Sequence, residues 1–152
     1  MDIKYITLVA PFISWFLAQF LKPFTHLFKT GQWDIKQISA SGGLPSSHSS
    51  LVSSLALAIG LKDGFDSSLF ALALVLSCIV AYDAMNVRYF AGENIRVTKM
   101  LVDELSEILP KLLTDNESLD KLKEVLGHTV VEVCCGYILG VLVTGVVYFF
   151  MK

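Results

Sequence analysis

The chain has 152 residues, enough for one domain, and it is 54% hydrophobic with only 17% charged residues. Soluble domains carry charge on about a quarter of their residues, so this composition and a mean hydropathy of +0.62 predict a membrane protein. A net charge of −2 gives no reason to expect a nucleic-acid partner. The three cysteines lie in apolar runs without zinc-finger spacing, which indicates packing or lipid-facing residues.

Four hydrophobic segments predict an all-α, integral-membrane helical bundle with about four transmembrane helices. In chain order they are residues 5–21, 48–61, 67–85 and 130–151. A span takes about 20 apolar residues, with a range of about 17–25. The second segment is short, so it needs shielding by its neighbours or an entrance that lies within the membrane. The first lacks a cleavage site followed by a polar region, so we interpret it as a retained helix and not a signal peptide.

Residues 88–127 differ in kind, because they hold most of the acidic residues and half of the basic ones. The stretch NIRVTKMLVDELSEILPKLL has apolar residues at helical spacing, which predicts an amphipathic surface helix that Pro110 kinks or ends. The stretch ESLDKLKEVLG predicts a second short helix that ends at Gly127. We expect a connector packed on the bundle, and one membrane-embedded domain over residues 1–152.

The Lys and Arg residues of the loops predict the orientation. If the four segments alternate, Lys4, Lys62 and Lys152 fall on one side and the other nine of the 12 basic residues on the opposite side. The positive-inside rule places the nine in the cytoplasm and both termini outside. The prediction is a multi-pass protein of the cell (inner) membrane.

Ionisable residues gather at the predicted cytoplasmic end of the bundle. His48 begins the second segment, Asp83 and Arg88 end the third, and His128 and Glu132 begin the fourth. Ionisable groups at such positions in a membrane protein are costly, which makes them functional candidates.

The spacing of His128 and Glu132 predicts an activated nucleophile. Four residues apart on a helix, they share a face, so the carboxylate can orient the imidazole and raise its basicity. The alternative is an ordinary helix start, in which Glu132 favours the positive end of the helix dipole. A zinc site formed by this pair with His48 is less favoured, because no short-spaced ligand motif is present, and we expect no metal or other cofactor.

The segment GGLPSSHSS predicts an anion site with a proton donor. Ser46 and Ser47 can cap free N–H groups at a helix start, while Gly42 and Gly43 allow close backbone approach. His48 can then protonate a leaving group, or it is an interfacial histidine at a capped helix start.

Three further charged residues complete the predicted phosphate site. Arg88 offers a bidentate donor to phosphate oxygens, or it anchors a helix end. Lys22 faces phosphate or snorkels to the interface, and we favour snorkelling. Asp83 can hold either cation.

Three blocks, GGLPSSHSS, YDAMNVRYFAG and LGHTVVEVCCG, resemble in this order the signature blocks of the divergent type-2 phosphatidic acid phosphatase family. That family is related to acid phosphatases and vanadium-dependent haloperoxidases, and the resemblance covers about residues 6–149. It implies a membrane phosphatase with His48 as general acid, His128 as nucleophile and Glu132 as its orienter. Ser47 stands where the wider superfamily has glycine, and Glu132 where it has aspartate.

Two departures from the superfamily pattern concern its positive charges. Six residues before His128 the chain has Leu122 in place of an arginine, and the superfamily's first lysine motif has only a partial counterpart in Lys22-Pro23. Arg88 is the candidate for the missing guanidinium.

Two functions from different classes remain open, with a third less favoured. The first is a membrane phosphatase that hydrolyses a phospholipid or polyprenyl phosphate, or a diphosphate, through a phosphohistidine and without metal. The alternative is a non-catalytic membrane protein that binds or moves phospholipids with a decayed site. The small size and membrane location argue against a vanadate-dependent peroxidase. Gly136 and Gly140 form a small-residue step for a homodimer, or for packing within the chain.

Overall fold

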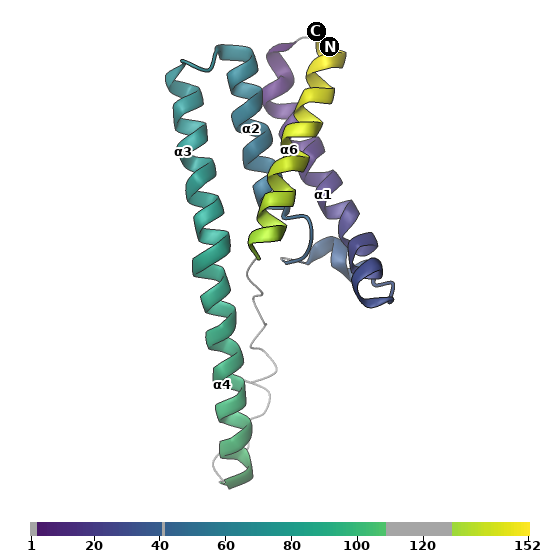
Figure 1. Cartoon of the computed structure of the whole chain (residues 1–152), viewed down its shortest axis with the longest axis vertical. Helices are drawn as coiled ribbons and strands as arrows, with labels where there is room; N and C mark the ends of the chain where they lie inside the picture. Colours follow the sequence, from purple (N-terminus) through teal and green to yellow (C-terminus); the bar gives the residue numbers. More distant parts are fainter. Residues whose placement is uncertain (1–2, 41, 109–128) are drawn as a thin grey trace.

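The computed structural model describes residues 3–40, 42–108 and 129–152, in which every regular element is a helix (Figure 1). The long helices are α1 (Ile6–Thr30), α2 (Ser47–Asp63), α3 (Ser68–Tyr82), α4 (Arg88–Ile108) and α6 (Val130–Met151). Three short turns complete the described part, namely the 3-10 turns η1 (Ile3–Tyr5) and η2 (Ile35–Ser39) and the π-helical turn η3 (Asp83–Val87). The predicted all-α bundle is confirmed.

Helix α2 is the central element of the bundle. It packs against α1, α3 and α6, and α1 also packs against α6. The four helices run side by side with alternating directions, and the two chain ends lie together at the upper end (Figure 1). The lower end therefore brings together the end of α1, the start of α2, the end of α3 and the start of α6.

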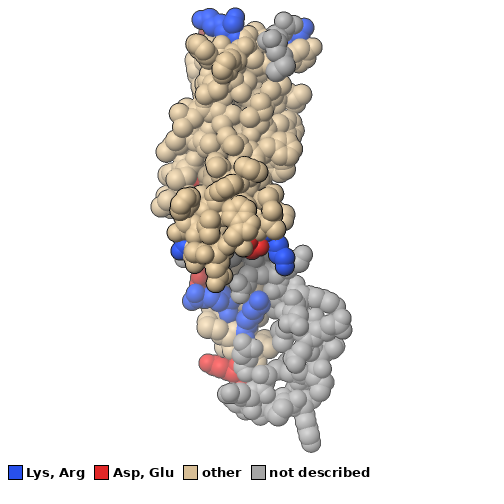
Figure 2. All heavy atoms as spheres, turned by 90° about the vertical axis from the view of Figure 1, so that its right-hand side faces the viewer, with Lys and Arg blue, Asp and Glu red and all other residues tan. Residues whose placement is uncertain are grey.

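Among the described residues, three helical stretches are long and apolar enough to cross a membrane, namely Ile3–Thr30, Ser68–Val102 and Val130–Met151. Helix α2 has 17 residues and is shielded by these neighbours, as its short apolar segment requires. Apolar side chains such as Phe16, Leu72 and Leu142 are exposed on the outside of the bundle. Figure 2 shows the resulting, mostly uncharged belt with charged side chains gathered at its ends. The protein is a membrane helical bundle.

Helix α1 is longer than the predicted segment of residues 5–21. It continues through Pro11 and Pro23, both buried, to Thr30, where Gly31 ends it in the left-handed conformation with φ 73°. A proline breaks a helix in water, but neighbouring helices let a membrane helix tolerate it. The Lys22-Pro23 pair, which follows the predicted segment, therefore lies inside a helix.

The third span also continues beyond its predicted end near Met85. The chain passes through η3 directly into α4, so α3 and α4 form one long rod (Figure 1). A π-turn inserts one extra residue without ending a helix. The predicted amphipathic helix thus begins earlier, at Arg88, and continues the third span. Pro110 and the second short helix fall outside the described residues.

A seam of small residues joins α2 to α6. A Cβ on Gly140 would lie 2.5 Å from the carbonyl oxygen of Ser50 and 3.0 Å from the backbone nitrogen of Ser54, and one on Gly136 would lie 2.9 Å from Cβ of Ser49. These distances leave no room for a side chain. The small-residue step is therefore filled by packing within the chain, which was the alternative to the predicted dimer contact.

Hydrogen-bonded hydroxyl groups join the helices inside the bundle, both in this seam and between the other helix pairs. Ser54 Oγ and Thr144 Oγ1 are 2.6 Å apart, and Ser14 and Ser50 bond through their hydroxyls across α1 and α2. Tyr137 on α6 donates its hydroxyl to the carbonyl of Ser77 on α3 at 2.7 Å. The bundle is thus apolar outside and rich in bonded hydroxyls inside.

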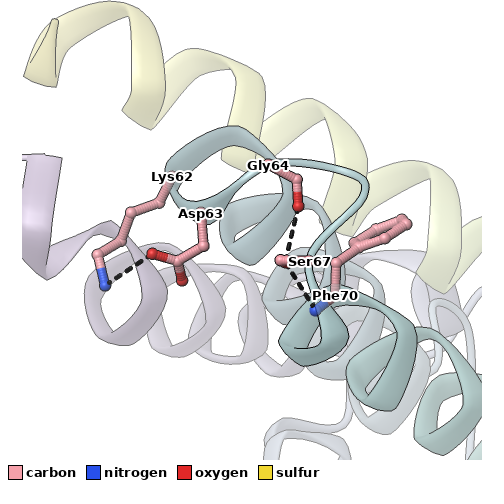
Figure 3. Close-up of polar contacts among 5 residues, drawn as sticks. All are labelled: Lys62, Asp63, Gly64, Ser67 and Phe70. Atoms are coloured by element: carbon pink, nitrogen blue, oxygen red, sulfur yellow. Dashed lines mark hydrogen bonds and ion pairs between the residues drawn. The ribbon is translucent and has the colours of Figure 1, made fainter.

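The upper end is closed by the tight connection from α2 to α3 (Figure 3). Gly64 has φ 94°, and its carbonyl accepts a hydrogen bond from Ser67 Oγ at 2.8 Å. Ser67 Oγ in turn accepts from the backbone N–H of Phe70 at 3.2 Å and so caps α3. Lys62 and Asp63 form an ion pair at 3.5 Å beside this turn. The connection fixes α2 antiparallel to α3.

The segment after α1 folds back on that helix. The ring of Trp33 meets the ring of Phe24 edge-on at 5.1 Å, and η2 packs against α1. Asp34 caps the start of η2. Its Oδ2 accepts from Gln37 Nε2 and its Oδ1 from the N–H of Lys36, both at 3.0 Å. These two bonds, with that of Gln37 the larger cause, hold the pKa of Asp34 below its ordinary value of 3.8.

Candidate functional site

The start of α2 is built by Ser46. Its hydroxyl caps the helix by accepting from the N–H of Ser49 at 3.4 Å, and the hydroxyl of Ser49 donates to it at 3.0 Å. The N–H of Ser46 donates to the backbone carbonyl of Glu132 at 3.0 Å. The predicted cap is confirmed for Ser46 but not for Ser47, whose hydroxyl bonds no described residue. Ser46 also ties the start of α2 to the first turn of α6.

Ser47 and His48 form the first turn of α2. Ser47 is completely buried, and its Oγ finds no hydrogen-bond partner among the residues that the structure describes. His48 follows and is half-buried. The first N–H groups of a helix have no acceptor within it, so this turn is the positive end of the helix dipole.

Lys22 lies beneath the loop that leads into α2. Its side chain is only 2% exposed, and Nζ donates to the carbonyl of Ala40 at 2.6 Å. A Cβ on Gly43, where φ is 98°, would meet Cγ and Cδ of Lys22 at 3.9 Å. Thr25 holds the same loop, because its hydroxyl bonds the carbonyl of Leu44. The preference for snorkelling is therefore wrong, since the ammonium points into the protein.

Glu132 lies in the first turn of α6 and forms a reciprocal cap with Thr129. The N–H of Glu132 donates to Thr129 Oγ1 at 3.4 Å, and Glu132 Oε2 accepts from the N–H of Thr129 at 3.1 Å. Its carboxylate also acts on Lys22 as a countercharge. Helix α6 begins at Val130, and His128 lies outside the described residues. The predicted contact between Glu132 and His128 therefore stays a prediction.

The end of the third span contributes Asp83 and the start of α4. Asp83 is half-buried in η3, and η3 packs against α6. Asn86 donates from Nδ2 to the carbonyl of Tyr82 at 3.2 Å, which holds the π-turn. Arg88 is the first residue of α4, but its side chain is not among those that the structure describes. The pairing of Asp83 with a cation stays a prediction.

These placements bring most of the predicted residues to one end of the bundle. The residues found there are Lys22, Gly42, Gly43, Ser46, Ser47, His48, Asp83 and Glu132. Two helix starts meet through the bond between Ser46 and Glu132, with the buried ammonium of Lys22 nearby. The positive end of α2 and the buried ammonium of Lys22 favour an anion at this junction, and the carboxylate of Glu132 offsets part of that positive potential.

Sequence reasoning missed the residues that hold this end together. Thr129 could have been found, since the spacing Thr-Val-Val-Glu over residues 129–132 is that of a capping box. Thr25 gives no such signal, because its partner, the carbonyl of Leu44, lies far along the chain. Within the described residues no three His, Cys, Asp or Glu side chains form a group that could hold a metal ion. The zinc alternative includes His128 and lies outside those residues.

Comparisons with known proteins support a common family. A family model described as "Divergent PAP2 family" matches residues 3–143. The chain is 38% identical over 141 residues to the "Uncharacterized membrane protein YuiD" of Bacillus subtilis (strain 168), a match that covers 88% of this chain and 89% of that protein. No solved structure matches the chain.

Proposed function

Because the chain belongs to the divergent PAP2 family, we propose that it is an integral-membrane phosphatase that hydrolyses a lipid phosphate or diphosphate through a phosphohistidine. The observation that carries the proposal is the junction of two helix starts beside a buried lysine. Ser46 bonds Glu132 across α2 and α6, and Lys22 lies under the same loop. An anion such as phosphate is the ligand that this arrangement favours.

In the proposed reaction His128 attacks phosphorus, and the bond between phosphorus and the leaving oxygen breaks. His48 donates its proton to that oxygen, so the leaving group departs as a neutral alcohol or as a monophosphate. The start of α2, Lys22 and Arg88 stabilise the charge on the remaining oxygens. Water then attacks the phosphohistidine, His48 accepts the proton of the water, and phosphate leaves while His128 is released.

The structure suggests particular roles for Lys22 and Glu132 in this reaction. Lys22 Nζ already donates to Ala40, so its proposed role is to hold the loop and supply a positive field. Glu132 Oε2 already accepts a hydrogen bond in the capping box. We propose that the same carboxylate also orients His128.

The loop charges support a site on the cytoplasmic side. Nine of the 12 basic residues fall at the end of the predicted spans that carries the site, and the positive-inside rule assigns this end to the cytoplasm. We therefore propose a multi-pass protein of the cell (inner) membrane, with one domain over residues 1–152. Both termini lie outside, and substrate enters from the inner leaflet.

A second candidate function is the binding or movement of phospholipids without catalysis. The engagement of Lys22 with Ala40 and of Glu132 with Thr129 favours it, because both side chains already have structural partners. The arginine missing from position 122 points the same way.

The deciding experiment is phosphate release by the purified full chain in detergent with EDTA. The substrates are phosphatidic acid, phosphatidylglycerol phosphate and a polyprenyl diphosphate. We expect release that is abolished in His128→Ala and reduced at least about a hundredfold in His48→Ala, the effect of losing a general acid. His26→Ala is the matched control, since His26 lies on α1 and bonds the carbonyl of Gln32. Full activity in His128→Ala refutes the phosphohistidine, and no release from any lipid favours the binding function.

A further inference from the structure

The segment that follows α1 turns back and lies beside the last turns of that helix (Figure 1). The ring centroids of Trp33 and Phe24 are 5.1 Å apart. Further along, Ile38 borders the same apolar surface as Phe20. Phe20 and Phe24 belong to a candidate span that ends only at Thr30. Residues 33–38 therefore lie beside this span and not beyond its end.

This segment and the end of α1 expose large apolar side chains. Phe28 is 88% exposed, Ile35 63% and Trp33 51%. Together with Phe24 and Ile38, which are also exposed, they form what we call the interfacial patch. Exposed apolar patches mark interaction sites, including those with membranes.

The interfacial patch continues the lipid-facing surface of α1 without a break. Phe16 and Phe20 are exposed on the span, and the rings of Phe20 and Phe24 have centroids 5.6 Å apart. The ring of Phe24 in turn meets that of Trp33. Because the rings follow one another from the span into the turn, the bilayer that surrounds the span is the partner that reaches the patch.

The length of α1 places Trp33 at the edge of the hydrocarbon. From Ile6, where α1 begins, to Phe24 the helix rises about 27 Å at about 1.5 Å per residue. The hydrocarbon core of a bilayer is about 30 Å thick. Just before α1, Lys4 Nζ lies 5.0 Å from the centre of the Tyr5 ring, a pair that suits one membrane interface. Trp33, beside Phe24, then lies at the opposite interface, where tryptophan is enriched.

The charged groups of the segment suit lipid headgroups. Lys29 and Lys36 are exposed. Asp34 is the one acidic residue between positions 3 and 62 of the sequence. Its carboxylate already accepts hydrogen bonds from Gln37 Nε2 and from the N–H of Lys36. Two ammonium groups against one carboxylate leave the segment with a net positive charge, which attracts anionic lipids.

We propose that the interfacial patch docks into the phospholipid surface at this end of the bundle, with Trp33 at the hydrocarbon edge and with Lys29 and Lys36 against anionic headgroups. The inference does not depend on the phosphatase reaction. Ala40 follows η2 directly, and its carbonyl accepts from Lys22 Nζ. The segment is then held by lipid on its outer side and by Lys22 at its end.

The first test is depth-dependent quenching of tryptophan fluorescence with the full chain in nanodiscs. The chain has two tryptophans, so Trp15→Phe reports on Trp33 alone, and Trp33→Phe is the matched control that reports on Trp15. Trp15 lies about 14 Å along α1, near the middle of the hydrocarbon. We expect a nitroxide on the lipid headgroup to quench Trp33 more than Trp15. Bromine atoms at the ends of the acyl chains should quench Trp15 more than Trp33.

The second test concerns the two lysines. In zwitterionic discs, a small fraction of anionic lipid with a headgroup nitroxide should quench Trp33 about fivefold more than the same fraction of labelled zwitterionic lipid, the effect of one net charge at a membrane surface. The double variant Lys29→Gln, Lys36→Gln should lose this preference. Lys62→Gln, a lysine at the opposite end of the bundle, should keep it. Circular dichroism and size-exclusion chromatography establish that each variant is folded.

Three outcomes would overturn the proposal. The first is quenching of Trp33 by water-soluble acrylamide but not by labelled lipid, which would place the segment in water. The second is crosslinking of residues 33–38 between two copies without quenching by lipid, which would show a second chain on the patch. The third is an unchanged preference for anionic lipid in the double lysine variant. Quenching needs no hydrolysis, so a chain that releases no phosphate refutes the phosphatase function and leaves this inference standing.

Discussion

Gly140 allows α2 and α6 to approach, and replacing it by alanine should destabilise the bundle. The new Cβ would lie 2.5 Å from the carbonyl oxygen of Ser50 and 3.0 Å from the backbone nitrogen of Ser54. Both atoms belong to the backbone of α2, so no side-chain rotation can relieve the clash. The two helices must move apart along this part of the seam.

The loss of unfolding free energy in Gly140→Ala can be estimated from the packing and the hydrogen bond that this separation disturbs. Inserting a methyl group into a packed core costs about 2 kcal/mol. Separation also weakens the bond between Ser54 and Thr144, now 2.6 Å long, and one such bond contributes about 1 kcal/mol. The better helix propensity of alanine offsets about 1 kcal/mol of this loss. Gly140→Ala should therefore lower the free energy of unfolding by about 2 kcal/mol.

Gly145→Ala is the matched control on the same helix. Nothing lies within 4 Å of a Cβ at position 145, so this variant should gain about 1 kcal/mol from helix propensity alone. The assay is unfolding by sodium dodecyl sulfate in mixed micelles, followed by circular dichroism. The two variants should differ by about 3 kcal/mol. If both unfold at the same detergent fraction, α2 and α6 do not approach as closely as described, and the reasoning is refuted.

Two further predictions concern the site and the segment beside it. Lys22→Met removes a charged donor from the carbonyl of Ala40, which should slow phosphate release about tenfold or more. Lys29→Met, on the exposed last turn of α1, should leave the rate unchanged. Equal rates in the two variants would exclude a role for the buried ammonium. Asp34 has a lowered pKa, so its stabilisation of η2 is complete above its ordinary value of 3.8 and is lost as the pH falls through the lower folded value. The fluorescence of Trp33, measured with the other tryptophan replaced by phenylalanine, should change in that acidic range; an unchanged transition in Asp34→Asn would contradict this assignment.

Helix starts were the most predictable part of the candidate site. Ser46 and Ser47 follow a proline and precede an apolar run, and this local pattern was enough to place the start of α2. The start of α6 was equally local, since Thr129 and Glu132 have capping-box spacing. Caps depend on residues three apart in the chain, so a sequence alone can reveal them.

Contacts between distant residues could not be predicted in the same way. The burial of Lys22 depends on Ala40 and on the loop that covers the lysine. A lysine near the end of a span has the same sequence pattern whether its ammonium snorkels to the interface or is buried in the protein. Gly136 and Gly140 indicate a close helix neighbour but do not say which helix, and the answer was α2 of the same chain. The continuity of α3 with α4 was hidden because polar residues around Asn86 resemble a helix end.

The hydroxyl-rich interior has a consequence for how the chain enters its membrane. Helix α2 carries six serines, counting its cap, from Ser46 to Ser54. Alone in lipid, Ser50 and Ser54 would lack their hydroxyl partners on α1 and α6. Translocon-mediated insertion selects segments by hydropathy, and α2 does not qualify as a span by length and composition. The tight turn from Gly64 to Ser67 offers a route, since it lets the strongly apolar α3 carry α2 into the bilayer as one helical hairpin. Biogenesis of this protein would then depend on α3 more than on the helix that bears His48.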